Sequence, residues 1–191
     1  MNNIMIDLET MGTNPHSPIV AIGAVFFNPV TGELGKTFYR TVDLESSMKL
    51  GLTPTANTIK WWMNQDKKVV EEVIKAKSSI TDALTALSQF AVFAYSPAAN
   101  YGGSLLKIWG NGSAFDNVIL RESYKACHLT PFWEFWNDMD VRTIVDMGRC
   151  VGFDPKRDIP FDGDRHNALA DAVHQAKYVS AIYKKLLNKP N

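Results

Sequence analysis

The stretch Ile4-Met5-Ile6-Asp7-Leu8-Glu9 places two acidic residues in an otherwise apolar run near the start of the chain. The run predicts a buried β-strand, along which side chains alternate between two faces. Asp7 and Glu9 therefore share one face. Two ionised carboxylates held side by side in a core repel each other and lose hydration, which is unfavourable without a cation. The stretch predicts a metal site on a core strand, unless one carboxylate lies exposed and idle at the strand end.

The residues after this strand predict a mixed sheet. Further strands are expected over 19–27, 36–42 and 105–109. Helical spacing predicts helices over 54–63, 68–76, 79–93, 140–150 and 167–187, and a loop is expected over 97–104. On the last helix, Leu169, Val173, Ala176, Ser180 and Tyr183 are expected to share one face. An antiparallel meander followed by alternating helices and strands indicates an α/β fold, with a mixed β-sheet flanked by α-helices.

The composition is that of a globular protein without a strong overall charge. The 191 residues suit one domain over 1–191, with 46% hydrophobic residues. Lys+Arg and Asp+Glu both number 20, so affinity for a polyanion has to come from local groups and metal ions. Two cysteines without CxxC spacing argue against a disulfide framework or a structural zinc site. The chain shows no leader pattern and no long apolar span, so we expect a cytoplasmic protein without a membrane partner.

A second acidic position is Asp116, in the segment Asn111-Gly112-Ser113-Ala114-Phe115-Asp116. It falls just after a predicted buried strand and at the start of a helix. Aspartate commonly caps helix N-termini, which is one interpretation of this residue. The carboxyl ends of core strands are also where α/β proteins place their ligands. Asp116 is therefore either a helix cap or a third acidic group of the site.

The third segment is His166-Asn-Ala-Leu-Ala-Asp171, at the start of the last predicted helix. Ala168 and Ala172 are small, so this helix can approach the strand that carries Asp7 and Glu9. Asp171 would then reach the same metal ions. A histidine titrates near neutral pH and can accept a proton from water. The segment by itself is weak, because a histidine followed five residues later by an aspartate is common by chance.

Together, the three segments resemble the DnaQ-like DEDD exonuclease superfamily in its histidine-containing branch. The motifs are Asp-x-Glu-Thr at 7–10, Phe-Asp at 115–116 and His-x-Ala-x-x-Asp at 166–171. The segments 58–62 and 135–143 are similar to DexA-type phage exonucleases and related bacterial and prophage exonucleases or exoribonucleases. The resemblance implies a ribonuclease H-like sheet. One departure is Gly112, where many members carry asparagine, so the contacts of that asparagine are in doubt here.

The resemblance implies a metal-dependent 3′→5′ exonuclease that releases nucleoside 5′-monophosphates from single-stranded DNA or RNA. Two Mg²⁺ or Mn²⁺ ions would be held by Asp7, Glu9, Asp116 and Asp171, and His166 would be the general base. Two metals suit phosphodiester cleavage, because one activates the attacking water and the other stabilises the leaving oxygen. A homodimer is also possible. The aromatic segment 132–136 would then be either part of the core or a contact between subunits.

Substrate contacts are expected at the strand end and along a neighbouring helix. They comprise Thr10, Met11, Gly12, Trp61, Trp62, Gln65, Phe115 and Arg142. Met11 has core filling as its alternative, since methionine adapts to irregular gaps. Adjacent helical residues point about 100° apart, so at least one of Trp61 and Trp62 is expected to be partly exposed. The other would anchor the helix.

The same residues leave two other functions open. One is a phosphodiesterase restricted to short oligonucleotides. The other is a non-catalytic nucleic-acid-binding domain of the same fold. The choice between DNA and RNA depends on a contact to the 2′-hydroxyl, which no spacing in the sequence reports.

Overall fold

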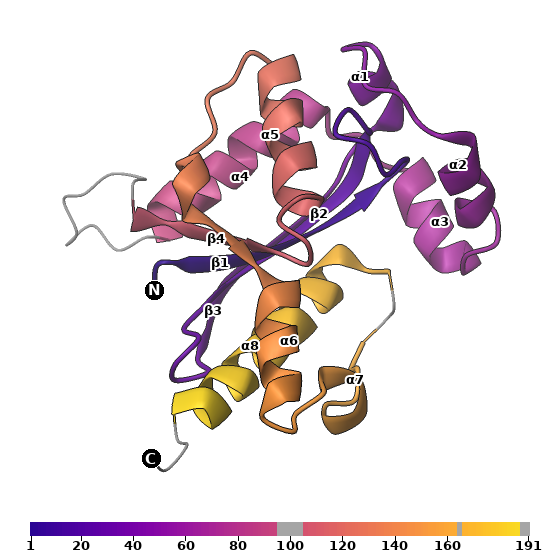
Figure 1. Ribbon diagram of the computed structural model, residues 1–191. Coiled ribbons are helices and arrows are strands. Elements are labelled where there is room, and N and C mark those ends of the chain that lie inside the picture. The colour runs from indigo at the N-terminus through magenta and orange to yellow at the C-terminus, as the bar shows by residue number, and fades with distance from the viewer. Residues whose placement is uncertain (95–104, 164–165, 188–191) are drawn as a thin grey trace.

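A five-stranded mixed sheet forms the centre of the protein, in the order β3-β2-β1-β4-β5 (Figure 1). The computed structural model describes residues 1–94, 105–163 and 166–187, so the loop expected over 97–104 lies outside the described residues. The strands are β1 (Asn3–Thr10), β2 (Ile19–Phe27), β3 (Leu34–Thr41), β4 (Lys107–Gly110) and β5 (Asp138–Asp140). β1, β2 and β3 are antiparallel, whereas β4 and β5 run parallel to β1. The predicted mixed sheet is confirmed.

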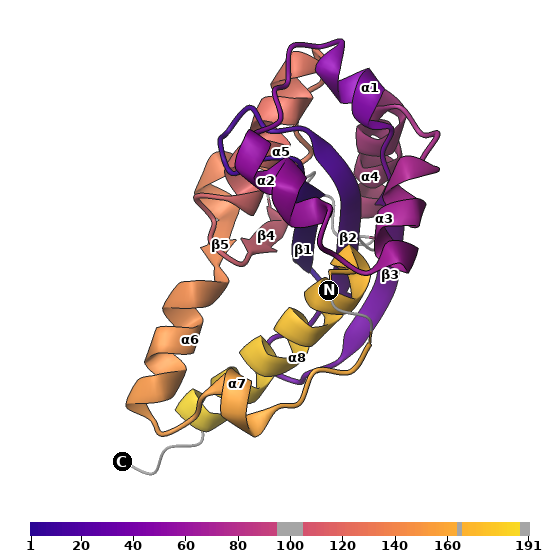
Figure 2. The same ribbon diagram turned by 90° about the vertical axis from the view of Figure 1, so that its right-hand side faces the viewer.

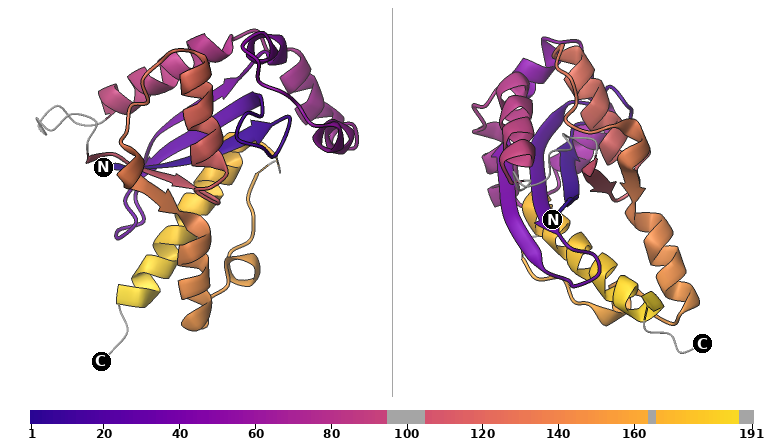
Figure 3. Two further views of the ribbon diagram at one scale, coloured as in Figure 1. Left: turned by 45° about the horizontal axis from the view of Figure 1, so that its top comes forward. Right: turned by 90° about the vertical axis from the view of Figure 1, so that its left-hand side faces the viewer.

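Helices cover both faces of this sheet. They are α1 (Leu44–Met48), α2 (Ala56–Trp62), α3 (Lys67–Ile74), α4 (Ile80–Ala94), α5 (Asp116–Ala126), α6 (Val141–Cys150), α7 (Pro155–Asp158) and α8 (Ala168–Leu187), with a short 3₁₀ helix η2 (Phe135–Asn137). α4 and α5 lie on one face, and α6 and α8 lie side by side on the other (Figures 1 and 3). α2 and α3 lie near the carboxyl end of β1 (Figure 2). Within the described residues, no helix combines the length and apolarity needed to span a membrane.

Four of these elements were not predicted from the sequence. They are the short helices α1, η2 and α7 and the edge strand β5. Their three to five residues are too few for an apolar period to be read, and β5 reads Asp-Met-Asp. β5 nevertheless helps to position α6, the helix that carries Arg142. Its last residue, Asp140, caps α6 by accepting a hydrogen bond from the Thr143 amide at 2.8 Å.

The two faces of β1 have different environments, as the strand period requires. Ile4, Ile6 and Leu8 join the apolar core beneath α4 and α5. Met5 joins the core beneath α6 and α8, and Asp7 shares its side of the strand. The apolar face thus anchors the strand, and the other face presents its carboxylates toward α8.

Helix α8 packs tightly against the sheet at Gly23, which pairs with Asp7 across β1 and β2. A methyl group at Gly23 would lie 2.1 Å from the carbonyl carbon of Ala168. Ala168 and Ala172 are fully buried, so small residues do permit close packing, as predicted. This tight contact is nevertheless with β2, one strand away from the acidic residues.

The face predicted for α8 needs a correction. Of that set, Leu169, Val173 and Tyr183 are only partly buried. The helix buries Ala168, Ala172, Gln175, Ala176, Tyr178, Val179, Ser180 and Ile182, so only Ala176 and Ser180 of the predicted set are buried. The polar residue Gln175 lies on this face because its side chain is hydrogen-bonded inside the protein. The apolar pattern therefore predicted part of the buried face and missed the rest.

Candidate active site

Three carboxylates from two elements meet at the carboxyl end of β1. Asp7, Glu9 and Asp171 each offer an oxygen atom, and these atoms all lie within 4.8 Å of one another. Asp7 and Glu9 come from β1, and Asp171 comes from the first turn of α8. The structure thus brings together residues separated by more than 160 positions in the sequence, and oxygen ligands at this spacing suit a hard divalent cation.

Asp116 is the fourth acidic residue, and it is 3% exposed. It begins α5, but the N-cap position belongs to Phe115, which makes no capping bond through its side chain. The Asp116 carboxylate instead accepts a hydrogen bond from the Leu8 amide at 3.3 Å, which joins it to β1. The simple helix-cap interpretation therefore does not describe this residue.

The junction before α5 is fixed by the neighbouring asparagine. The side-chain amide of Asn117 donates to the Ile108 carbonyl and to the Asp138 carboxylate, both at 3.0 Å. Gly110 allows this packing, since a methyl group there would lie 2.4 Å from the Asn117 side-chain oxygen and 2.9 Å from the Asp116 Cβ. β4, β5 and α5 are thus tied together at the point where Asp116 enters the site.

The acidic residues disfavour one another's charge. Burial, together with the charges of Asp116, Glu9 and Asp171, raises the pKa of Asp7 well above its ordinary value. Burial, then Asp171 and Asp116, raises the pKa of Glu9 to about 8. Burial also raises the pKa of Asp116 to about 7, although hydrogen bonds from backbone amides and the charge of Arg142 oppose this shift. A cluster with these pKa values is poised to bind cations, because a divalent ion would remove both the repulsion and the desolvation cost.

Gln175 is a site residue that the sequence did not suggest. Its side-chain amide donates a 2.7 Å hydrogen bond to the Asp7 carboxylate, and the residue is 4% exposed. It lies one helical turn after Asp171 on α8, so both side chains project from the same face. The spacing of four residues from Asp171 was the only hint in the sequence that Gln175 faces the site. Without the tertiary structure, its partner on β1 could not be identified.

His166 lies at the entrance to α8, close to the acidic cluster. Its backbone amide donates to the Asp171 carboxylate at 3.1 Å, and its φ of +63° is unusual for a residue with a side chain. Its ring meets the edge of Trp61 at a centroid distance of 4.9 Å, with the ring planes perpendicular. His166 is therefore held beside the carboxylates by its own backbone and by a tryptophan from α2.

A groove of about 660 Å³ opens next to the acidic cluster. It lies between the end of β1, helix α2 and the start of α5. Five of the residues proposed from the sequence line it: Glu9, Thr10, Gly12, Trp61 and Phe115. The Thr10 hydroxyl donates to the Gly12 carbonyl at 2.7 Å, which fixes the bend of the chain after β1. Gly12 also packs against Ser17, where a methyl group would lie 2.4 Å from the hydroxyl oxygen.

Three of the residues proposed to bind substrate have other roles. Trp62 is 4% exposed, and its indole N–H donates to the Thr10 carbonyl at 2.9 Å, so it anchors α2 as expected for one of the two tryptophans. Met11 packs with Trp62 in a small apolar core, which is the core-filling alternative. Gln65 donates to the Trp61 carbonyl at 2.9 Å and closes the end of α2. None of these three lines the groove.

Arg142 lies on the first turn of α6 and does not line the groove. Its guanidinium packs against Gly112, where a methyl group would lie 3.1 Å from the guanidinium carbon. Gly112 has a φ of +109°, a conformation that favours glycine. The departure from asparagine at this position therefore has a local reason: glycine accommodates both the backbone turn and the arginine beside it.

The chain matches a known family over almost its full length. The model of the 3′-5′ exoribonuclease Rv2179c-like domain matches residues 2–183. The chain belongs to this Rv2179c-like family. Membership confirms the 3′-5′ exonuclease assignment and the resemblance to the DEDD exonucleases.

A curated relative and several solved structures agree with this membership. The exodeoxyribonuclease of Enterobacteria phage T4 is 23% identical over 167 residues, which cover 76% of this chain and 71% of that protein. The nuclease domain of 3′hExo, a DEDDh family member bound to rAMP, has a TM-score of 0.59 at 18% identity, covering 94% of this chain and 89% of that one. E. coli exonuclease I in complex with a dT13 oligonucleotide has a TM-score of 0.57 at 14% identity, covering 98% and 41%. These structures share the fold of the Rv2179c-like chain.

Proposed function

We propose that this Rv2179c-like protein hydrolyses single-stranded nucleic acid from its 3′ end with two Mg²⁺ or Mn²⁺ ions. The carboxylate cluster is the observation that carries the proposal, since three acidic groups lie within 4.8 Å and a buried fourth joins them. Asp7, Glu9, Asp116 and Asp171 would hold the ions. Bound there, such ions lower the pKa of an attacking water and stabilise the oxygen that leaves.

His166 is proposed as the general base for this hydrolysis. Its imidazole takes a proton from the attacking water, and the resulting hydroxide forms the new bond to phosphorus. The bond from phosphorus to the 3′ oxygen breaks, and the proton is finally delivered to that oxygen. The products are one nucleoside 5′-monophosphate and a strand one nucleotide shorter with a free 3′-hydroxyl. A side chain anchored beside Asp171 by its own backbone is well placed for this transfer.

The groove beside the cluster is proposed to receive the terminal nucleotide. Trp61 is 40% exposed and Phe115 is partly buried, so both offer apolar surface to a base or sugar. Stacking of a base on an aromatic ring is worth about 1–3 kcal/mol and does not depend on sequence. The family description names an exoribonuclease and the phage relative is an exodeoxyribonuclease, so both polymers have to be compared directly.

The proposal is tested with 5′-labelled 20-nucleotide single strands of RNA and DNA, incubated with Mg²⁺ or Mn²⁺. A ladder that shortens from the 3′ end, with release of 5′-mononucleotides, is expected for at least one polymer. A strand blocked by a 3′-phosphate should resist the reaction. Binding of the strand without any shortening would show a non-catalytic domain instead, and cleavage confined to dinucleotides would show a phosphodiesterase for short oligonucleotides.

Substitutions assign the roles within the site. Asp7→Asn and Asp171→Asn should lower the rate by on the order of 10³-fold or more, because neither can hold the ions as a carboxylate does. His166→Asn should lower kcat by about 10²–10⁴-fold without changing the Mg²⁺ concentration for half-maximal rate. Asp146→Asn, at an exposed position on α6, is the matched control and should keep the wild-type rate.

A further inference from the structure

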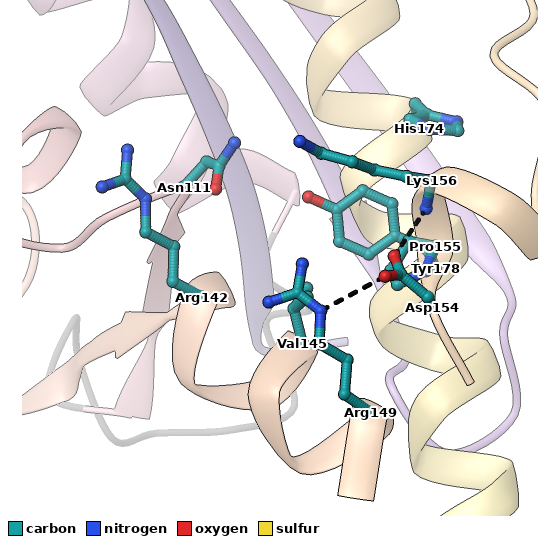
Figure 4. A pocket seen from close by; sticks show the side chains of 9 residues that line it. All are labelled: Asn111, Arg142, Val145, Arg149, Asp154, Pro155, Lys156, His174 and Tyr178. Atoms are coloured by element: carbon teal, nitrogen blue, oxygen red, sulfur yellow. Dashed lines mark hydrogen bonds and ion pairs between the residues drawn. The ribbon is translucent and has the colours of Figure 1, made fainter. Parts of the chain in front are cut away.

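A second hollow, of about 510 Å³, lies between α6, α7 and α8, and it differs chemically from the groove. Basic and aromatic side chains line it, among them Arg142, Arg149, Lys156, His174 and Tyr178 (Figure 4). Asp154 is the single carboxylate among its lining residues, against three strongly basic groups. The hollow, which we call the basic pocket, therefore carries local positive charge in a chain whose formal net charge is zero.

Two of these basic groups are available to a ligand. Arg149 is engaged by Asp154, with its Nε 3.3 Å from the carboxylate. Within the parts of the chain that the structure describes, no carboxylate lies within 4.0 Å of the charged groups of Arg142 or Lys156. Figure 4 shows the Lys156 side chain reaching across the pocket toward Asn111. A guanidinium and an ammonium that line one hollow, with no carboxylate partner among the described residues, form a suitable site for an anion.

The basic pocket adjoins the acidic cluster. Arg142 lines the pocket, and its charge opposes the rise in the pKa of Asp116. Tyr178 lines the pocket from α8, where burial and the charges of Asp7 and Asp171 raise the pKa of its hydroxyl. An anion bound in the pocket would therefore lie beside the carboxylate cluster but outside the proposed metal site.

The pocket and the groove are separate hollows that share no lining residue. Glu9 lines the groove, whereas Arg142, whose charge acts on Asp116, lines the pocket. The groove is lined by aromatic, hydroxyl and apolar groups and suits one nucleotide. The basic pocket suits phosphates. If the last nucleotide of a strand fills the groove and its phosphodiester lies at the carboxylates, the preceding phosphates lie outside the groove, where the basic pocket can receive them.

We propose that the basic pocket binds backbone phosphates of the nucleic-acid strand on the 5′ side of the bond being cleaved. Arg142 and Lys156 supply the contacts, and the proposal rests on the exonuclease function proposed above. It gives a neutral protein a local means of holding a polyanion. It also predicts that affinity grows with strand length, since a dinucleotide has one phosphodiester, which lies at the carboxylates, and none to reach the pocket.

The test measures binding without turnover. In the Asp7→Asn background with Mg²⁺ present, fluorescence anisotropy gives Kd for labelled strands of two, four and eight nucleotides. Lys156→Glu should weaken binding of the eight-nucleotide strand by about tenfold or more, and by much less for the dinucleotide. The slope of log Kd against log salt should fall by about 0.7 for each phosphate of the single strand that the variant no longer binds. Lys156→Arg should keep the length dependence.

A matched control and a competition experiment complete the test. Lys125→Glu makes the same charge change at an exposed position on α5, which packs on the opposite face of the sheet from α6 and α8, and should leave the length dependence intact. Equal losses for long and short strands in Lys156→Glu, or identical behaviour of the two variants, would overturn the proposal. The proposal would also be overturned if inorganic phosphate or a free 5′-mononucleotide required Lys156 for binding but the eight-nucleotide strand did not. A wild-type protein that shortens no strand would contradict the exonuclease function itself, which the binding assay does not measure.

Discussion

The side-chain amide of Gln175 donates a 2.7 Å hydrogen bond to the carboxylate of Asp7, joining the middle of α8 to the central strand. The bond orients an acidic group whose charge is opposed by three neighbouring carboxylates, and it counteracts the rise in the pKa of Asp7. Gln175 thus acts as a positioning residue for a proposed metal ligand.

We predict that Gln175→Ala lowers metal affinity by about 10–100-fold, the usual cost of removing a group that orients a ligand. The measurement is the Mg²⁺ concentration for half-maximal rate, with kcat at saturating Mg²⁺ as the second readout. Recovery of rate at high Mg²⁺ would separate ligand orientation from a direct catalytic role. Gln89→Ala, at an exposed position on α4, serves as the control. An unchanged Mg²⁺ requirement in Gln175→Ala would remove this role.

Gly23 is predicted to be required for docking α8. A methyl group at this position would overlap the Ala168 backbone at 2.1 Å, and backbone cannot move aside as a flexible side chain can. Gly23→Ala should therefore lower the free energy of unfolding by about 1–3 kcal/mol, the usual cost of overpacking. It should also weaken metal binding, because Asp171 moves with the helix.

Urea unfolding with and without Mg²⁺ checks this prediction. Gly35→Ala on β3 is a milder comparison, since its nearest neighbours are the Met1 sulfur at 2.9 Å and the Phe26 Cβ at 3.0 Å. A Gly23→Ala protein as stable as the wild type, with the same Mg²⁺ requirement, would show that α8 can shift without disturbing the site.

Stability and metal binding are predicted to depend on pH in opposite directions. In the metal-free protein the pKa of Glu9 is raised to about 8, above an ordinary value of 4.5. Between these two pH values the folded state retains a proton that the unfolded state releases, so the free energy of unfolding falls as pH rises. Deprotonation is what cation binding requires, so stabilisation by Mg²⁺ should increase over the same range.

Thermal unfolding in EDTA at pH 5.5 and pH 8.0 provides the measurement, repeated with Mg²⁺. Tm should be lower at pH 8.0 in EDTA, and the gain on adding Mg²⁺ should be larger there. Glu9→Gln should reduce the pH dependence of Tm in EDTA, because it removes the titrating group. A metal-free Tm that rises between these pH values in the wild type but not in Glu9→Gln would contradict the predicted direction of the pH dependence.

Trp61 and Trp62 are predicted to serve substrate binding and stability, respectively. Trp61→Ala removes an exposed ring from the groove and a contact to His166, so it should raise KM by roughly 10-fold to 100-fold, in line with the loss of one stacked base. Trp62→Phe removes the buried hydrogen bond to the Thr10 carbonyl and should lower the free energy of unfolding by about 1–3 kcal/mol.

Each tryptophan variant is the control for the other. Steady-state kinetics and urea unfolding on both proteins should show the larger change in KM for Trp61→Ala and the larger loss of stability for Trp62→Phe. The reverse pattern would mean that the ring in contact with His166 is structural and the buried ring reaches substrate.

Much of the fold was accessible from local patterns. The bounds of β2 were predicted without error, and the major helices were predicted within a few residues, because apolar periods of 2 and 3.6 record which face of an element is buried. The short elements α1, η2, α7 and β5 were missed, since a period cannot be read from so few residues. The buried face of α8 was predicted only in part: Gln175 was missed because it is polar and its partner, Asp7, lies 168 residues away.

The sequence by itself determined the chemistry of the candidate site: two carboxylates on one face of a strand, Asp116 after a second strand, and a histidine followed by Asp171 on a helix. Residue type and strand period suffice for that much. Only the tertiary structure decided which side chains share a space. It placed Trp61 rather than Trp62 in the groove, set Gln175 against Asp7, and gathered Arg142 and Lys156 around one hollow. These relationships join distant parts of the chain through packing, and packing depends on the three-dimensional path of the backbone rather than on any local spacing.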